Sequence, residues 1–230
     1  MIDLLKNKKA IFFDVGYTLD YPASGDWMFT DKFREIAGEK FCGYSESEIE
    51  EAKNKGLKYL KDNHLVLNTE EEYKQFIYFY NEISRFLSLG LTENAIKEIA
   101  HDRTYNMKNY ILYPDAPQVL ETLAKTHKLG VISDTWPSIE QQLDTLGVIK
   151  YFSSTTYSCY LGTFKPDKLM YTDALEKIGF SAEDTVFIDD SLQNLKGAAE
   201  LGITPILIAA NPASDIDSPF LKIHSLKELL

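Results

Sequence analysis

Short apolar runs alternate with helical patterns along most of this sequence, and this alternation restricts the possible folds more than any other feature. Each run is too short for a buried helix and is bounded by polar or turn residues, which predicts a buried strand. The runs are AIFFDV at 10–15, LGVISD at 129–134, YFSSTTY at 151–157, TVFIDD at 185–190 and TPILIA at 204–209. Strands that alternate with helices form a parallel sheet with helices on both faces, so we expect an α/β fold.

One long stretch interrupts this alternation, because the pattern from about residue 21 to residue 110 is helical throughout. Ser45 and Glu48 have the spacing of a capping box, and so do Thr69 and Glu72. Behind each pair the apolar residues recur at helical spacing, and we expect no strand within this stretch. The sequence therefore predicts a helical bundle inserted into the α/β unit. The expected domains are an α/β core of residues 1–18 and 111–230 and a helical domain of residues 19–110.

The charge balance excludes several classes of partner. The 230 residues include 24 Lys and Arg against 35 Asp and Glu, which gives a formal net charge of −11. A duplex nucleic-acid binder needs a basic face to displace phosphate counterions, and docking on anionic lipid also needs basic residues. The sequence shows no signal-peptide pattern and no apolar run near ~20 residues. We therefore expect a cytoplasmic protein with a small-molecule partner, bound to neither nucleic acid nor membrane.

Polar side chains follow three of the predicted strands. Asp14 ends the first run, Ser133 and Asp134 end the second, and Asp189 and Asp190 end the run at 185–190. The carboxyl ends of parallel strands meet at one edge of a sheet, where active groups gather. We therefore expect these acids and the hydroxyl to lie close together.

Lys165, in the sequence GTFKPD, adds a cation to this set. Together these residues are the equipment for transferring a phosphoryl group to a carboxylate. Asp14 is the candidate nucleophile, which would form an aspartyl-phosphate. Asp190, helped by Asp189, would hold Mg²⁺ together with Asp14 and mask the repulsion between carboxylate and phosphate. Ser133 and Lys165 are candidates to bind the non-bridging phosphate oxygens.

The order of these residues resembles the haloacid dehalogenase superfamily, and the resemblance spans nearly the whole chain. The four motifs of that superfamily are matched in order by Asp14 with Thr18, by Ser133, by Lys165 followed by Pro166, and by the pair Asp189 and Asp190. The resemblance implies a Rossmann-like core, an inserted helical cap of the first type and hydrolase activity. It further implies a Mg²⁺-dependent phosphatase that acts on a small phosphorylated metabolite.

One position departs from the pattern of that superfamily. Its phosphatases carry a second Asp two residues after the nucleophile, which serves first as general acid and then as general base. Here that position is Gly16. Family members bind Mg²⁺ through the backbone carbonyl of this residue, so the implied metal ligands are Asp14, the Gly16 carbonyl, Asp189 and Asp190. Loss of general acid–base catalysis lowers the rate roughly 10²–10⁴-fold, least for acyl or aryl phosphates.

Gly16 also leaves two alternative functions open. A haloacid dehalogenase-like hydrolase of carbon–halogen bonds works without Mg²⁺ and without that acid, although the pair Asp189 and Asp190 weighs against it. The other alternative is a catalytically weakened, phosphate-binding or regulatory protein. Asp134 has two candidate roles, as a phosphate-binding residue or as an acidic residue at the start of a helix. Tyr17 and Trp27 are candidates to face the substrate.

Overall fold

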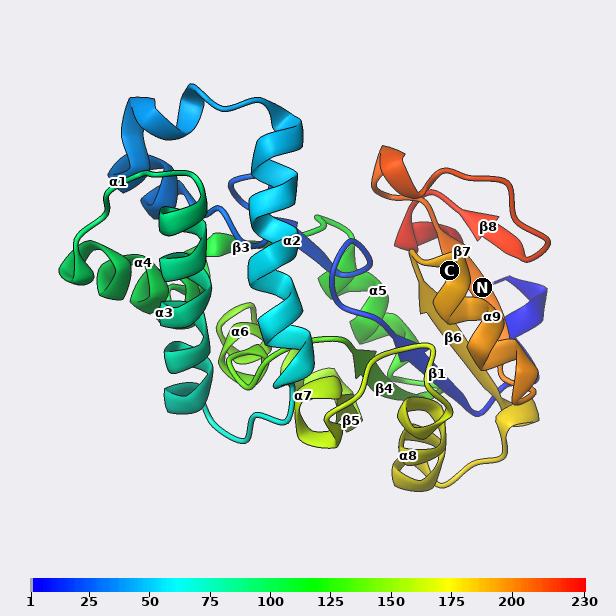
Figure 1. The fold of residues 1–230 in the computed structure, drawn as a ribbon. Coiled ribbons are helices and arrows are strands. Elements are labelled where there is room, and N and C mark those ends of the chain that lie inside the picture. Colours follow the sequence, from blue (N-terminus) through cyan, green and yellow to red (C-terminus); the bar gives the residue numbers. More distant parts are fainter. Residues whose placement is uncertain (1) are drawn as a thin grey trace.

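A six-stranded parallel sheet forms the centre of the structure, a computed structural model that describes residues 2–230 (Figure 1). In sheet order the strands are β5 (Phe152–Tyr157), β4 (Lys128–Ser133), β1 (Ala10–Phe13), β6 (Thr185–Asp189), β7 (Thr204–Ile208) and β8 (Leu221–Ile223). The predicted α/β fold is therefore confirmed. The sequence does not predict the edge strand β8, because its three residues have a partly exposed pattern and leave no apolar run to detect.

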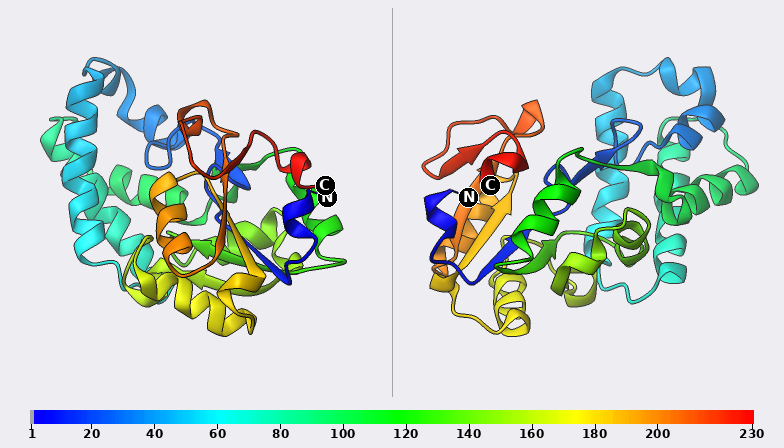
Figure 2. Two further views of the ribbon diagram at one scale, coloured as in Figure 1. Left: turned by 90° about the vertical axis from the view of Figure 1, so that its right-hand side faces the viewer. Right: turned by 180° about the vertical axis from the view of Figure 1, so that it is seen from behind.

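Helices cover both faces of this sheet (Figure 2). Alternate residues of β1 point to opposite faces, so Ile11 and Phe13 belong to one apolar cluster and Ala10 and Phe12 to another. The helices around the sheet are α5 (Ala116–Leu123), α6 (Ile139–Thr145), α7 (Ser158–Leu161), α8 (Lys168–Ile178) and α9 (Leu192–Glu200). The first cluster contains residues of α5 and α6, and the second contains residues of α8 and α9. Within residues 2–230, no helix combines the length and apolarity that crossing a bilayer requires.

The remaining long helices form a bundle beside the sheet, which Figure 1 shows in blue to green. They are α1 (Asp31–Cys42), α2 (Glu46–Asp62), α3 (Thr69–Phe86) and α4 (Glu93–Tyr105). The bundle has its own apolar core, built around Phe33, Phe76 and Tyr80. The predicted capping box of Ser45 and Glu48 is confirmed at the start of α2.

The second predicted capping box is wrong. The cap of α3 is Asn68, whose side chain accepts a hydrogen bond from the Glu71 amide, and Thr69 is already the first helical residue. Glu72 is turned away from the helix start and is buried against Ser138, which precedes α6. The spacing of Thr69 and Glu72 is that of a capping box, but a contact with a distant segment takes the Glu72 carboxylate instead.

The prediction of a stretch without strands is wrong at both of its ends. Strand β2 (Asp20–Pro22) pairs antiparallel with β3 (Tyr110–Leu112), so the chain leaves the sheet and returns to it through a two-stranded ribbon. Each strand has three residues and pairs with a partner some ninety positions away in sequence, so neither shows the period-two alternation of a longer strand. The division into residues 1–18 with 111–230 and residues 19–110 stays a prediction.

Candidate active site

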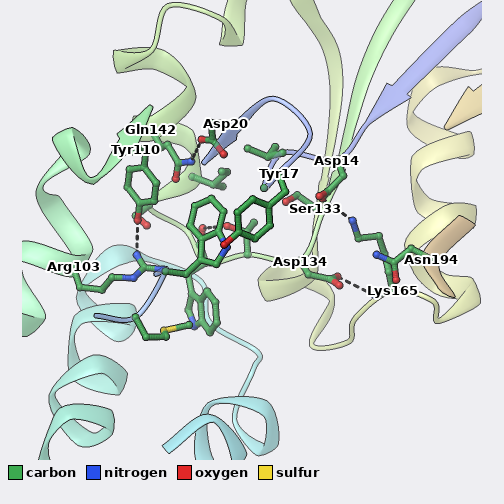
Figure 3. A pocket seen from close by; sticks show the side chains of 18 residues that line it. Asp14, Tyr17, Asp20, Arg103, Tyr110, Ser133, Asp134, Gln142, Lys165 and Asn194 are labelled. Carbon is green, nitrogen blue, oxygen red and sulfur yellow. Dashed lines mark hydrogen bonds and ion pairs between the residues drawn. The ribbon is translucent and has the colours of Figure 1, made fainter. Parts of the chain in front are cut away.

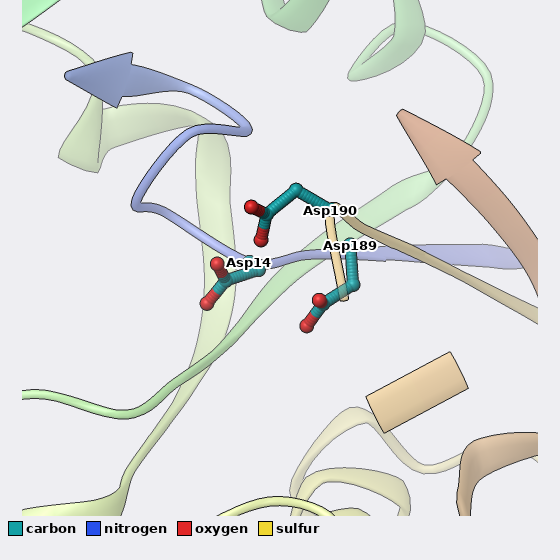
Figure 4. A group of neighbouring side chains, drawn as sticks. All are labelled: Asp14, Asp189 and Asp190. Carbon is teal, nitrogen blue, oxygen red and sulfur yellow. The ribbon is translucent and has the colours of Figure 1, made fainter. Parts of the chain in front are cut away.

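The carboxyl edge of the sheet brings the predicted acids together. Phe13, the last residue of β1, pairs with Val131 of β4 and with Ile188 of β6, so these strand ends lie side by side. Asp14 follows β1 directly, and Asp189 and Asp190 stand at the end of β6. These three residues offer carboxylate oxygens that all lie within 4.8 Å of one another (Figure 4).

Lys165 places a buried cation in this acidic cluster. Its Nζ donates hydrogen bonds to Asp14 Oδ1 at 2.6 Å, to Asp189 Oδ2 at 2.8 Å and to the Ile132 carbonyl at 3.1 Å. Burial opposes the charge on the ammonium, but the carboxylates of Asp14, Asp189 and Asp134 hold the pKa of Lys165 above its ordinary value. Lys165 therefore stays positively charged beside the candidate nucleophile.

The two adjacent acids at the end of β6 have different surroundings. Asp189 accepts hydrogen bonds from Lys165 Nζ, from the Ser191 amide and from Asn194 Nδ2, so both of its oxygens already have donors. Asp190 accepts one side-chain hydrogen bond, from Ser214 at 2.9 Å. Burial and the neighbouring Asp189 raise the pKa of Asp190 to about 6. Asp190 therefore has the freer carboxylate of the pair.

The carboxylate oxygens of this cluster fit a divalent cation. Burial raises the pKa of Asp14, Lys165 opposes the rise, and Asp189 and Asp190 add to it. One ammonium thus stands against three carboxylates, which leaves an excess of negative charge. Mg²⁺ prefers carboxylate oxygen ligands and usually takes one or two of them from the protein. Asp14 and Asp190 offer such oxygens, and Asp189 holds Lys165 beside them.

Ser133 and Asp134, which end β4 and begin the loop after it, lie at the same edge. Ser133 is buried and lines the cavity beside Asp14. The carboxylate of Asp134 accepts a hydrogen bond from the Lys165 amide at 2.9 Å, and this contact positions the backbone of Lys165. The alternative role of Asp134 at a helix start is wrong, because the next helix, α6, begins only at Ile139.

An aromatic ring covers the position at which family phosphatases carry their second Asp. A Cβ atom on Gly16 would lie 3.2 Å from Cζ2 of Trp27, closer than ordinary van der Waals contact. The Trp27 indole packs edge-on against Tyr17, with ring centroids 5.2 Å apart, and stacks with Tyr110 at 6.2 Å. The Trp27 indole therefore occupies the space that a side chain at position 16 would need.

A cavity of about 250 Å³ lies between the acidic cluster and the helical bundle (Figure 3). Asp14, Ser133 and Lys165 line it on the side of the sheet. Tyr17 and Trp27, the two aromatic candidates, also line it. The volume is below the ~300–1,000 Å³ that is usual for drug-sized ligands, so the cavity suits a small metabolite.

Sequence reasoning missed the polar residues on the opposite wall of this cavity. They are Asp20 on β2, Arg103 on α4, Tyr110 on β3 and Gln142 on α6. Asp20 is fully buried and accepts a hydrogen bond from Gln142 Nε2 at 2.5 Å, and burial raises its pKa to about 7. No local signal marks these positions, because each is a single polar residue within an unremarkable helical or short extended segment.

The chain matches known proteins over most of its length. The family model described as haloacid dehalogenase-like hydrolase matches residues 8–202. Among curated proteins, glyceraldehyde 3-phosphate phosphatase of Methanocaldococcus jannaschii is 31% identical over 136 residues, which are 55% of this chain and 59% of that protein. The chain thus covers less than two thirds of the length of this relative.

Solved structures share the fold. The HAD phosphatase from Thermococcus onnurineus has a TM-score of 0.62 and 21% identity, with 96% of this chain and 95% of that chain covered. The 2-haloacid dehalogenase from Pseudomonas syringae pv. Tomato DC3000 has a TM-score of 0.64 and 19% identity, with 96% of each chain covered. At these identities the likeness shows the fold alone. The family match, however, covers most of the chain, which therefore belongs to the haloacid dehalogenase-like hydrolases.

Proposed function

We propose that this hydrolase is a Mg²⁺-dependent phosphatase that acts on a small phosphorylated metabolite through Asp14. The observation that carries the proposal is the placement of the Asp14 carboxylate. It lines a small cavity, accepts a hydrogen bond from the buried Lys165 ammonium and has an oxygen within 4.8 Å of oxygens of two further carboxylates. The similarity to a protein named glyceraldehyde 3-phosphate phosphatase supports the same activity.

Each residue has a separate task in the proposed reaction. Asp14 attacks phosphorus, the bond to the leaving oxygen breaks, and the phosphoryl group becomes attached to the carboxylate. Lys165 and Ser133 bind the non-bridging oxygens, while Asp134 and Asp189 position Lys165. Water then attacks the aspartyl-phosphate, which releases inorganic phosphate and regenerates Asp14.

The metal ligands in this proposal are Asp14, Asp190, Asp189 and the backbone carbonyl of Gly16. When bound, Mg²⁺ supplies positive charge that keeps the carboxylates ionised and reduces their repulsion of the substrate phosphate. The excess of acid over base in the cluster fits this requirement, since Lys165 alone opposes the charge of the acids.

Gly16 determines which substrates the enzyme would prefer. An alkyl phosphate needs a proton on its leaving oxygen, and Gly16 has no side chain to give one. The leaving groups of acyl and aryl phosphates depart without a proton. Their hydrolysis is therefore slowed little by the lack of a general acid, whose contribution is roughly 10²–10⁴-fold where it is needed. We therefore propose that the enzyme favours good leaving groups.

The test is phosphate release from acetyl phosphate, p-nitrophenyl phosphate and glycerol 3-phosphate, with and without Mg²⁺. We expect metal-dependent turnover of the first two, a kcat/KM at least ~10²-fold lower for the alkyl phosphate, and no turnover by Asp14→Asn. Equal rates on all three substrates would refute the leaving-group preference. Turnover by a folded Asp14→Asn variant would remove Asp14 as the nucleophile. Tight, Mg²⁺-dependent phosphate binding with little turnover would favour a regulatory protein.

A second candidate function is hydrolysis of a carbon–halogen bond, with Asp14 attacking carbon. The observation that favours it is the Trp27 indole over Gly16, because that chemistry needs no acid at this position. The carboxylates of Asp189 and Asp190 disfavour it, since the reaction needs no metal. Release of chloride from 2-chloropropionate in the presence of EDTA would establish this function in place of the phosphatase.

A further inference from the structure

Arg103 is a buried cation on the wall of the cavity that faces Asp14. It lies near the end of α4, is 6% exposed and lines the cavity. Figure 3 shows its side chain extending from the bundle toward the middle of the cavity, with Asp14 and Lys165 on the far side. Arg103 and Lys165 are the cationic residues among the described residues that line this cavity.

The hydrogen bonding of Arg103 is incomplete. Its Nη1 donates to the Tyr110 hydroxyl, but its Nε is buried and has no partner within residues 2–230. The carboxylates of Glu72 and Asp102 interact electrostatically with Arg103, but their hydrogen bonds are made to other groups. Glu72 accepts from the Ser138 amide and hydroxyl at 2.8 and 2.7 Å, and Asp102 accepts from Thr30 at 2.8 Å. A buried charge with unsatisfied donors is unfavourable unless a ligand or partner completes it.

Aromatic rings hold the guanidinium in place. Its Cζ lies 4.6 Å from the centroid of the Phe76 ring and 5.8 Å from that of the Tyr110 ring. A guanidinium restrained in this way loses little side-chain freedom when it binds, and its planar fork matches a carboxylate bidentately. On the same wall, Oδ1 of Asp20 is also buried and has no hydrogen-bond partner among the described residues. This wall therefore has the polar groups of a binding site.

We infer that Arg103 binds a carboxylate of the substrate, at the end opposite the phosphate. The substrate class is then a short carboxylic acid that carries its phosphate on a good leaving oxygen, and this assignment rests on the proposed phosphatase function. A second phosphate group fits less well, because a dianion facing this wall would meet Arg103 alone among the described cations. The cavity of about 250 Å³ also limits the substrate to a short carbon chain between its two anionic ends.

The experiment compares two probes that share a phosphate and differ in the carboxylate. Calorimetry with Mg²⁺ measures the binding of 3-phosphoglycerate and glycerol 3-phosphate to Asp14→Asn, which prevents turnover. We expect 3-phosphoglycerate to bind ~100-fold more tightly, and the double variant Asp14→Asn/Arg103→Met to lose this preference. Arg85→Met in the same background is the matched control, because Arg85 is an exposed arginine of the same bundle. Its preference should be unchanged.

A second variant, Arg103→Lys, keeps the test informative if Arg103→Met does not fold. Arg103→Lys keeps the charge and most of the apolar stem but cannot bind bidentately, so we expect the preference to fall ~10-fold. Equal affinity of Asp14→Asn for the two probes would overturn the inference. An unchanged preference in Arg103→Met, or in Arg103→Lys if only that variant folds, would overturn it too.

Hydrolysis of p-nitrophenyl phosphate separates failure of this inference from failure of the phosphatase. This substrate has no carboxylate, so its hydrolysis by the wild-type enzyme tests the phosphatase activity without depending on a carboxylate contact to Arg103. If the wild type releases no phosphate from it, the proposed function fails and the substrate class falls with it. If it does release phosphate while the two probes bind equally, only the role of Arg103 is rejected.

Discussion

At the scale of single residues, Trp27 controls what can be introduced at position 16. A Cβ atom there would lie 3.2 Å from the indole, so Gly16→Asp has to displace the ring. We expect Gly16→Asp alone to lower the free energy of unfolding by about 1–3 kcal/mol and to add little activity. Gly16→Asp with Trp27→Leu should recover stability and raise kcat/KM for glycerol 3-phosphate at least ~10-fold.

The matched control for this pair is Gly16→Asn with Trp27→Leu, which has the same shape but no acid. Thermal unfolding measures the effect of each pair on stability, and phosphate release measures its effect on activity. If the Asn pair gains as much activity on the alkyl phosphate as the Asp pair, the gain comes from space in the cavity and not from a proton donor.

Asp20 makes stability depend on pH. Burial raises its pKa in the folded protein from 3.8 to about 7, so folding favours its protonated form. The contribution to stability is full below about pH 4 and is lost as the pH rises through 7. Relative to Asp20→Asn, the wild type should lose about 2–3 kcal/mol of unfolding free energy between pH 5 and pH 8. Chemical denaturation at both values measures this. A constant difference between the two proteins would show that Asp20 does not titrate there.

At the scale of elements, the ends of β1, β4 and β6 concentrate negative charge that Lys165 offsets. Lys165→Met removes the ammonium from Asp14 and Asp189 and leaves them buried and uncompensated. We expect the free energy of unfolding to fall by about 3–5 kcal/mol. Lys168→Met, an exposed lysine at the start of α8, is the control and should change it by less than ~0.5 kcal/mol.

A titration of Lys165→Met and of the wild type with Mg²⁺ tests the proposed metal site by stability alone. A cation bound by the acidic cluster should raise the melting temperature of Lys165→Met more than that of the wild type, because the variant has more uncompensated negative charge. Equal shifts in both proteins, or none, would count against a metal site at Asp14, Asp189 and Asp190.

The sequence predicts elements well where the apolar pattern is local. Strand β1 is buried over all four of its residues, and its continuous apolar run makes it easy to find. Strands β2 and β3 are short, and each pairs with a strand that lies beyond the whole bundle in sequence. The same reason explains the error at α3, where the Glu72 carboxylate bonds to Ser138, sixty-six positions further on, rather than to its own helix start.

The two walls of the cavity also differ in how well the sequence predicts them. Asp14, Ser133 and Asp189 follow predicted strands, and the polarity of a parallel sheet brings such residues to one edge without any tertiary detail. Arg103 comes from the inserted segment, and nothing in its local sequence indicates that it faces Asp14. Trp27, from the same segment, is a sequence candidate to face the substrate, but its packing over Gly16 is not predicted. Their places depend on how the bundle packs over the sheet, which is a property of long-range contacts.

At the scale of the whole molecule, Glu72 and Ser138 join the bundle to the sheet unit. Burial raises the pKa of Glu72 to about 6, with Arg103 and Ser138 opposing the rise, so the carboxylate is ionised at pH 8. Ser138→Ala removes the hydroxyl donor from this buried group. We expect the free energy of unfolding to fall by about 1–3 kcal/mol at pH 8 and by less at pH 5, where Glu72 is protonated.

Ser47→Ala, at an exposed position on α2, is the matched control for Ser138→Ala. Its unfolding free energy should stay within ~0.5 kcal/mol of the wild type at both pH values. Urea denaturation at pH 5 and pH 8 measures all three proteins. If the loss in Ser138→Ala is the same at both pH values, the ionisation of Glu72 does not contribute to the contact.

The ribbon of β2 and β3 has a consequence for how this protein could be re-engineered. Everything between Pro22 and Tyr110 is a single excursion of the chain, which enters and leaves through two adjacent antiparallel strands. Part of the wall that would choose the substrate, including Trp27 and Arg103, therefore belongs to one continuous insert, while the reacting groups are encoded outside it. That insert could be exchanged for one from another protein of the same architecture by joining the chains at only two points. Both points lie in the ribbon of β2 and β3, which already holds the two ends of the insert side by side.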